Sequence, residues 1–328
     1  IEVGSTMYLG WKGSGTVNQT GGTVIVTHAN GIHVATDIDG TEGIYNLHGG
    51  TLRTPQINIA AGPAQNRTTL LSFDNGGTLE NNGSGLMTTA IPVEIKAGGG
   101  TISTPGGGAD IRLTGSLTGA GDLTKSGAGT LTLGGTAAAY TGGINVSAGT
   151  LRVNTSLAAS SGVDVAAGAT LGGTGTIGGP TSIRSGGSLA TGASVGTLTF
   201  LDDLTLANGA IWDWEFIDTS SYDQAVGDNG ASLILPTAGS TPAITLNILG
   251  EPGHTVDWYD EFTIFTGDVV NFDAGLFDLV NDSDWARGWQ IASSGQNLVL
   301  TAVPEPGSLV LLAVSLLGLL ALGRRRRM

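Results

Sequence analysis

Short runs in which apolar and polar residues alternate dominate the first two thirds of the chain, and most follow a glycine. Residues 15–24 align with residues 43–52 at an offset of 28 without a gap. A Gly-Gly-Thr-aliphatic unit or a close variant then recurs, with its aliphatic residue at Leu79, Ile102, Leu131, Leu151, Leu171 and Leu189. Beyond Gly129 the interval settles at about 20 residues. Alternation with period two predicts short strands, and the glycine pair supplies the positive φ of a corner.

A rung of about 20 residues suits a parallel β-solenoid, in which each coil stacks its strands on the next and buries a continuous aliphatic core. A stack of antiparallel hairpins is the alternative. The regular interval and the scarcity of Asn-Gly loops favour the solenoid. Asn18 and Asn46 precede the corner, where they could stack in a ladder or close an Asx turn.

The pattern changes near Phe200. Five of the six tryptophans lie beyond it, and residues 202–286 hold 16 acidic residues with no lysine or arginine. Strand-like runs separated by Pro236, Pro242 and Pro252 remain. Because the end of a solenoid needs a cover, we expect a β-sandwich-like or capping region here.

The last segment has a different pattern. Residues 309–322 are apolar except for Ser315 and Gly318, and four arginines follow. As a helix, residues 308–323 would span about 24 Å, slightly short of the ~30 Å hydrocarbon core, and snorkelling arginines can cover the mismatch. The positive-inside rule predicts a cytoplasmic C-terminus, with everything before Pro304 outside the inner membrane. A buried core helix is the alternative.

Composition and charge exclude several classes of function. The net charge is −14, and without the terminal arginines nine basic residues face 27 acidic ones, a net −18. Such a surface repels nucleic acids. Cysteine is absent, which excludes disulfides and thiol chemistry. The 56 glycines follow no G-X-Y period, so collagen is excluded. Because Ile1 opens within a repeat and without an export leader, we expect the natural N-terminus to lie upstream.

Candidate chemical motifs are weak. Residues 173–178 match a dinucleotide fingerprint and residues 192–196 a nucleophile elbow, but neither has the surrounding helix that its chemistry needs. The histidines, expected in loops or rungs, lack metal-ligand spacing; they are His28, His33, His48 and His254. No catalytic residue, metal ligand or cofactor is expected.

Two acidic features leave room for a site. Residues 37–42 begin like a calcium loop but lack the bidentate glutamate at its twelfth position, and Asp282 and Asp284 are similarly suggestive. Asp213 and Glu215 would share one face of a strand, with Trp212 and Trp214 on the other. This arrangement predicts an acidic edge over buried tryptophans or, as the alternative, a groove that binds or cleaves polysaccharide.

The end of the chain resembles the PEP-CTERM sorting signal of Gram-negative and related bacteria. It has the same order of Pro304-Glu305-Pro306, an apolar run and terminal arginines, here Arg324, Arg325, Arg326 and Arg327. The resemblance implies recognition and cleavage near Pro-Glu-Pro by an exosortase-type membrane enzyme. Pro304, Glu305 and Pro306 are then substrate residues. The precursor would be anchored in the inner membrane, and the mature protein would be released to, or fixed on, the cell surface or extracellular matrix.

Residues 127–133 and 140–153 resemble the autotransporter-associated β-strand repeat, closely over about 27 residues and more loosely over 1–200. That resemblance implies a right-handed β-helix exposed on the bacterial surface.

The expected architecture is therefore all-β, with solenoid repeats over 1–199, an acidic β-rich cap over 200–302 and a sorting tail with one transmembrane helix over 303–328. The leading hypothesis for function is a non-enzymatic structural or adhesion protein of the cell surface or matrix, with exopolysaccharide as a further candidate partner. The alternative is a carbohydrate-binding or polysaccharide-degrading β-helix protein. A concave groove with clustered carboxylates and exposed aromatic residues would favour the alternative, and a smooth solenoid covered by Thr and Asn the leading hypothesis.

Overall fold

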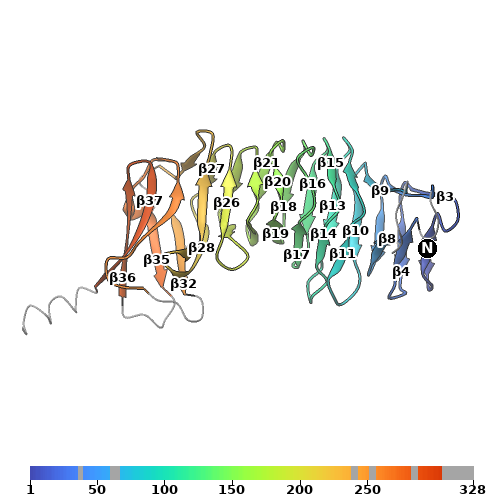
Figure 1. Ribbon diagram of the computed structural model, residues 1–328, viewed down its shortest axis with the longest axis horizontal. Coiled ribbons are helices and arrows are strands. Elements are labelled where there is room, and N and C mark those ends of the chain that lie inside the picture. Colours follow the sequence, from blue (N-terminus) through green and yellow to red (C-terminus); the bar gives the residue numbers. More distant parts are fainter. Residues whose placement is uncertain (36–39, 60–66, 238–242, 251–255, 282–286, 305–328) are drawn as a thin grey trace, which may run out of the picture.

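The computed structural model describes residues 1–35, 40–59, 67–237, 243–250, 256–281 and 287–304. Within them the chain winds into an elongated parallel β-solenoid whose coils follow one another along the long axis (Figure 1). Successive strands go in turn to three faces, so that strands adjacent in a sheet come from adjacent coils. This confirms the all-β solenoid over the hairpin stack.

The first face is one sheet, 12-stranded within the described residues, and its ladder is parallel throughout. Its strands are, in order, β1 (Glu2–Val3), β4 (Thr23–Val26), β7 (Thr51–Thr54), β10 (Gly77–Asn81), β13 (Gly100–Ser103), β16 (Leu123–Ser126), β18 (Gly143–Val146), β21 (Gly162–Val165), β24 (Thr181–Ile183), β27 (Leu204–Leu206), β31 (Ser232–Ile234) and β34 (Asp268–Val270).

The second face consists of two parallel sheets, one after the other. The shorter contains β2 (Met7–Leu9), β5 (Ile32–Val34) and β8 (Ile57–Ile59). The longer contains β11 (Met87–Thr89), β14 (Ile111–Leu113), β17 (Thr130–Leu133), β19 (Gly149–Val153), β22 (Ala169–Gly173), β25 (Ser188–Thr191), β28 (Ala210–Asp218), β32 (Ile244–Gly250) and β35 (Phe277–Asn281), and β29 (Ser221–Tyr222) pairs antiparallel with β28. A 3₁₀ turn, η1 (Ala274–Leu276), leads into β35.

The third face also consists of two sheets. The first contains β3 (Ser14–Gln19), β6 (Glu42–Leu47), β9 (Thr68–Phe73), β12 (Val93–Ile95) and β15 (Leu117–Gly119). The second contains β20 (Ser156–Leu157), β23 (Thr176–Ile177), β26 (Thr197–Phe200), β30 (Gln224–Gly227), β33 (Glu261–Thr266), β37 (Asn297–Pro304) and β36 (Arg287–Ser294). The last two pairings of this sheet are antiparallel, so a hairpin ends the parallel ladder.

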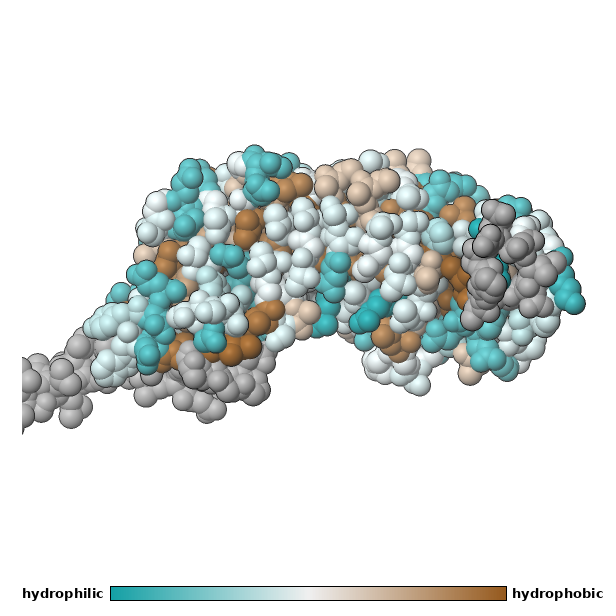
Figure 2. Space-filling model, in the orientation of Figure 1, coloured by the Kyte–Doolittle hydropathy of each residue, from teal (hydrophilic) through white to brown (hydrophobic). Residues whose placement is uncertain are grey.

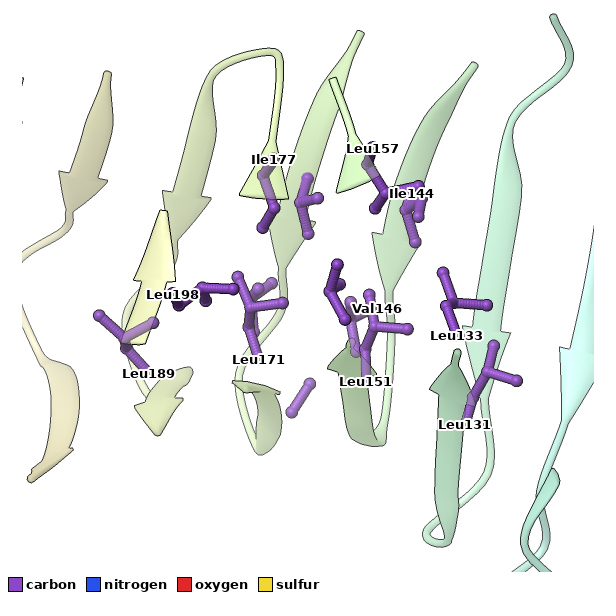
Figure 3. Close-up of a cluster of buried hydrophobic side chains, with 14 of the residues drawn as sticks. Leu131, Leu133, Ile144, Val146, Leu151, Leu157, Leu171, Ile177, Leu189 and Leu198 are labelled. Carbon is purple, nitrogen blue, oxygen red and sulfur yellow. The ribbon is translucent and has the colours of Figure 1, made fainter. Parts of the chain in front are cut away.

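Inward side chains form columns along the solenoid axis. On the second face Leu131, Leu151, Leu171 and Leu189 occupy successive positions in register and are fully buried (Figure 3). Apolar burial of this kind contributes about 25 cal/mol per Å² of surface removed from water. The aliphatic residue of each repeat unit is therefore the residue that builds the core.

The repeat unit does not stay on one face. Thr51, Thr78 and Thr101 lie in register on the first face, whereas Thr130 and Thr150 lie on the second. The position in register with Thr101 on the next coil is Thr124, which no Gly-Gly pair precedes. The long interval between Thr101 and Thr130 is thus the length of one full coil plus the distance from the first face to the second. From that point on, the glycine pair precedes the second face instead of the first.

The composition change near residue 200 marks no break in the ladders. Ala190 pairs with Asp213 and Asp213 with Asn247, so the parallel ladder crosses into this region while the interval between paired residues grows from 23 to 34. Longer coils enclose a wider core, which larger side chains must fill. Trp212 and Trp214 do so, and both are fully buried.

Among the described residues, no helix is long and apolar enough to cross a membrane. The transmembrane helix expected over 308–323 lies outside the described residues and stays a prediction.

Candidate functional site

The sorting segment begins inside the folded structure. Ala302 lies on β37, is fully buried, and its backbone N–H donates to the carbonyl of Asp260 at 3.0 Å. The strand ends at Pro304. Glu305, Pro306 and the four arginines from Arg324 to Arg327 lie outside the described residues. The predicted substrate segment, which starts at Pro304, therefore begins at the last residue of a hydrogen-bonded strand.

A lysine occupies a core column of the first face. Lys125 is in register with Ile102 on one side and Val146 on the other, and its side chain is fully buried. Its ammonium donates to three carbonyl oxygens: those of Ser126 (3.0 Å), Gly127 (2.8 Å) and Ala148 (2.9 Å). Burial lowers the pKa of Lys125 to about 8, and the Asp110 carboxylate opposes that shift.

The position of Lys125 at a corner of the solenoid explains why a charged group is buried there. Corners of a solenoid leave backbone carbonyls outside the strand ladders, and a buried carbonyl without a donor is costly. One ammonium supplies three donors and satisfies carbonyls from two successive coils. The sequence analysis missed this residue, although period two along Leu123-Thr124-Lys125 already places the lysine on the inward face.

Tyr140 has the same kind of role. Its ring is fully buried, and its hydroxyl donates toward the carbonyls of Gly121 (2.9 Å) and Gly143 (2.7 Å) while it accepts from the backbone N–H of Leu123 (3.1 Å). Because a hydroxyl has one proton, the two carbonyls share a single donor. The backbone of Tyr140 also forms an isolated parallel β-bridge with Gly119. Tyr140 therefore continues the third face on a coil that has no full strand there.

Asn18 and Asn46 form the ladder that was one of the two expected outcomes. The Asn46 amide donates to the Asn18 side-chain oxygen at 2.7 Å, and the Ser72 hydroxyl donates to the Asn46 side-chain oxygen at 2.7 Å. The three residues are in register on the third face. Side-chain bonds therefore reinforce the backbone ladder across three coils.

The acidic edge over buried tryptophans is confirmed. Trp212 and Trp214 point into the core, where Trp214 stacks on Phe216 at 5.1 Å between ring centroids. Asp213 accepts from the side-chain amide of Asn247 at 2.6 Å on the half-exposed face. Neither of these two tryptophans is exposed to a ligand, so the face that carries Asp213 and Glu215 does not provide the aromatic groove that the alternative required.

One shallow pocket lies on the outer surface of the second face. It has a volume of about 140 Å³ and lies above the small residues Gly172 and Ala190, with Arg152 on one side and Glu215 on the other. Ser194, from the sequence that mimics a nucleophile elbow, is exposed at its edge. Among the residues that line the pocket there is no histidine that could activate this serine.

The other candidates lie apart from one another. His28 contacts the Thr6 hydroxyl, His33 lies on β5, and His48 contacts the Ser72 hydroxyl, which are the loop and rung positions expected. His254, the calcium-like residues 37–39, and Asp282 and Asp284 lie outside the described residues. In the part of the chain that the structure describes, no three histidine or acidic side chains come close enough to hold a metal ion.

Among the described residues, exposed aromatic side chains gather at two places that the sequence analysis did not single out. Near the first coils, Tyr8 and Trp11 are 43% and 46% exposed, with ring centroids 4.3 Å apart. In the turn before β33, Trp258 and Tyr259 are 52% and 65% exposed. The middle of the face shown in Figure 2 is covered mainly by residues of near-neutral hydropathy, with small apolar patches between them.

Comparisons with known proteins identify two segments. Residues 123–153 match the passenger-associated-transport-repeat model, and residues 302–327 match the PEP-CTERM protein-sorting motif. No curated protein matches the chain. The first segment contains Lys125 and Tyr140, and the second begins at Ala302. The chain is thus a β-solenoid that contains a passenger-associated repeat and continues into a PEP-CTERM sorting motif, the signal of an exported protein processed by an exosortase-type enzyme.

Proposed function

We propose that this chain is a non-enzymatic structural or adhesion protein of the bacterial cell surface or extracellular matrix, held in the inner membrane as a precursor and freed by exosortase-type processing. The single observation that carries the proposal is the sorting motif at 302–327, directly joined to an extended solenoid. A protein built to be exported and displayed needs a body that stays folded outside the cell.

The solenoid has properties suited to that role. Its stability comes from backbone ladders and stacked apolar columns rather than from disulfides, since the chain contains no cysteine. Rows of threonines such as Thr51, Thr78 and Thr101 give the first face a regular hydroxyl-bearing surface. Hydroxyls spaced by the ~4.8 Å strand separation offer many weak contacts to a polar polymer, which is what adhesion or matrix packing requires.

Localisation tests the proposal. The full chain would be expressed with an export leader in a host with and without an active exosortase, and its size and membrane association compared. We expect a shortened protein outside the inner membrane only when the enzyme is present. A Pro304→Ala, Pro306→Ala variant should remain at precursor size, whereas Pro105→Ala, an exposed proline in the solenoid, should be processed normally. An unprocessed chain in both hosts would refute the sorting role.

The pocket above Gly172 and Ala190 favours a second candidate, a carbohydrate-binding protein. A cation and a carboxylate on opposite sides of a floor without bulky side chains could orient an acidic sugar unit. Binding of the full chain to an acidic polysaccharide should then weaken in Arg152→Ala. Arg112→Ala lies in the same outward row two strands away and serves as the control. Equal binding by both variants would remove this candidate.

A further inference from the structure

The turn from Asp257 to Asp260 presents two large aromatic side chains to solvent. Trp258 and Tyr259 are both more than half exposed. Tyr259 also has φ of +72°, in the left-handed region that non-glycine residues rarely adopt. Such a conformation is unfavourable for an L-residue and is often found at functional positions. Neither ring belongs to the apolar core.

This turn lies where the chain leaves the solenoid. The backbone N–H of Tyr259 donates to the carbonyl of Ala302 at 2.7 Å, and the N–H of Ala302 donates to the carbonyl of Asp260 at 3.0 Å. Ala302 is the first residue of the sorting motif. The aromatic pair is therefore fixed beside the start of the segment that is to be processed.

The length of the connection limits how far the turn can lie from a membrane. Only residues 305–308 separate Pro304 from the apolar run that begins at Leu309. Even a fully extended chain covers about 3.3–3.6 Å per residue, so Pro304 lies within ~18 Å of Leu309. The polar layer on each side of a bilayer is about 5–8 Å thick. If the apolar run enters the hydrocarbon, Pro304 lies no more than ~13 Å beyond that layer, and a linker that is not fully extended brings the turn into contact with it.

The side chains of the turn suit a lipid surface. Tryptophan and tyrosine are the residues enriched at membrane interfaces, because each combines an apolar ring with a polar group. The exposed carboxylates of Asp257 and Glu261 disfavour an anionic surface. We propose that Trp258 and Tyr259 contact the headgroup layer of a zwitterionic lipid surface while the sorting segment is inserted. This inference rests on the membrane-held precursor of the proposed function.

Fluorescence quenching tests the contact. The full chain would be reconstituted into phosphatidylcholine vesicles whose acyl chains carry bromine near the headgroup, and tryptophan quenching measured. We expect quenching of the native chain, with much of it lost in Trp258→Phe. Trp11→Phe is the matched control, because Trp11 is similarly exposed but lies near β3, at the opposite end of the solenoid from β37 (Figure 1). Equal quenching of the native chain and Trp258→Phe would overturn the proposal.

A second variant separates lipid contact from recognition by the processing enzyme. Trp258→Ser combined with Tyr259→Asn removes both rings, and asparagine tolerates the left-handed backbone. Native-like circular dichroism and slower processing in cells, with no difference in vesicle quenching between native chain and Trp258→Phe, would assign the turn to the processing enzyme and refute lipid contact. A native chain that fails to float with vesicles would refute the membrane-held precursor itself. Flotation therefore distinguishes failure of the proposed function from failure of this inference alone.

Discussion

Replacing Lys125 by methionine tests whether the buried ammonium stabilises the repeat through the carbonyls that it satisfies. Methionine has similar length and is apolar, so the aliphatic column stays filled. The carbonyl of Ser126 keeps a backbone donor from Thr104 at 3.0 Å. The carbonyls of Gly127 and Ala148 lose the donor that Lys125 provides. The substitution thus removes two hydrogen bonds that the surrounding backbone does not replace within the described contacts.

Two opposing contributions determine how much Lys125→Met changes the free energy of unfolding. A buried carbonyl left without a donor costs about 1–3 kcal/mol, so two such groups cost about 2–6 kcal/mol. The lowered pKa of Lys125, about 8 against its usual 10.5, means that burial of the charge costs the folded state at most ~3 kcal/mol at pH 7, and methionine removes that cost. The middle of the first range, about 4 kcal/mol, less the ~3 kcal/mol cost of the buried charge leaves an expected loss of about 1 kcal/mol in the free energy of unfolding of Lys125→Met at pH 7.

The change with pH in the stability difference between the native chain and Lys125→Met is a second, independent test. Because the folded state holds this proton less tightly than the unfolded state, the cost of the charge is fully present below pH 8. It disappears as the pH rises from about 8 to 10.5. Over that window the native chain should gain stability relative to Lys125→Met, since the neutral amine still donates hydrogen bonds.

Urea unfolding of the full chain at pH 7 and at alkaline pH, followed by the fluorescence of the buried tryptophans, measures both effects. Lys96→Met is the control, because Lys96 is partly exposed and lies 4.0 Å from the partly exposed Glu94. It should change stability by no more than about 0.5 kcal/mol. The reasoning is wrong if Lys125→Met is as stable as the native chain at pH 7, or if its deficit shrinks as the pH rises.

Three further changes test the contacts of the solenoid. Tyr140→Phe removes the hydroxyl that holds three backbone groups and should lower the free energy of unfolding by about 2–4 kcal/mol; a loss below about 1 kcal/mol would show that water replaces it. Asn46→Ala breaks the side-chain ladder on the outward side of the third face and should cost about 1 kcal/mol in the same urea assay, and an unchanged midpoint would count against the ladder. Gly77→Ala places a Cβ in steric clash with the backbone oxygen of Leu47, whereas the Cβ of Gly76→Asn meets nothing within 4 Å. Gly77→Ala should therefore lower stability several times more than Gly76→Asn, and comparable thermal midpoints would contradict the packing.

The sequence by itself determined the local structure and the sorting signal. Alternation with period two fixed which side chains point inward, so Leu131, Leu151 and Leu171 could be predicted as core residues before their stacking was known. A recurring unit with a regular interval favoured a solenoid because identical coils bury the same columns. The order of Pro-Glu-Pro, apolar run and arginines could be recognised from the sequence alone because it is a linear pattern.

Only the tertiary structure decided which corner each unit occupies and which residues lie in contact. The repeat spacing could not reveal that the units at Thr101 and Thr130 lie on different faces, because a change of corner and a longer coil lengthen the interval equally. It also could not show that Tyr259 is hydrogen-bonded to Ala302, 43 residues later. Period two could place Lys125 on the inward face, but only the closed coil shows which backbone carbonyls its ammonium satisfies there. Inward direction is a local property of a strand, whereas what a side chain meets there depends on residues one coil or more away.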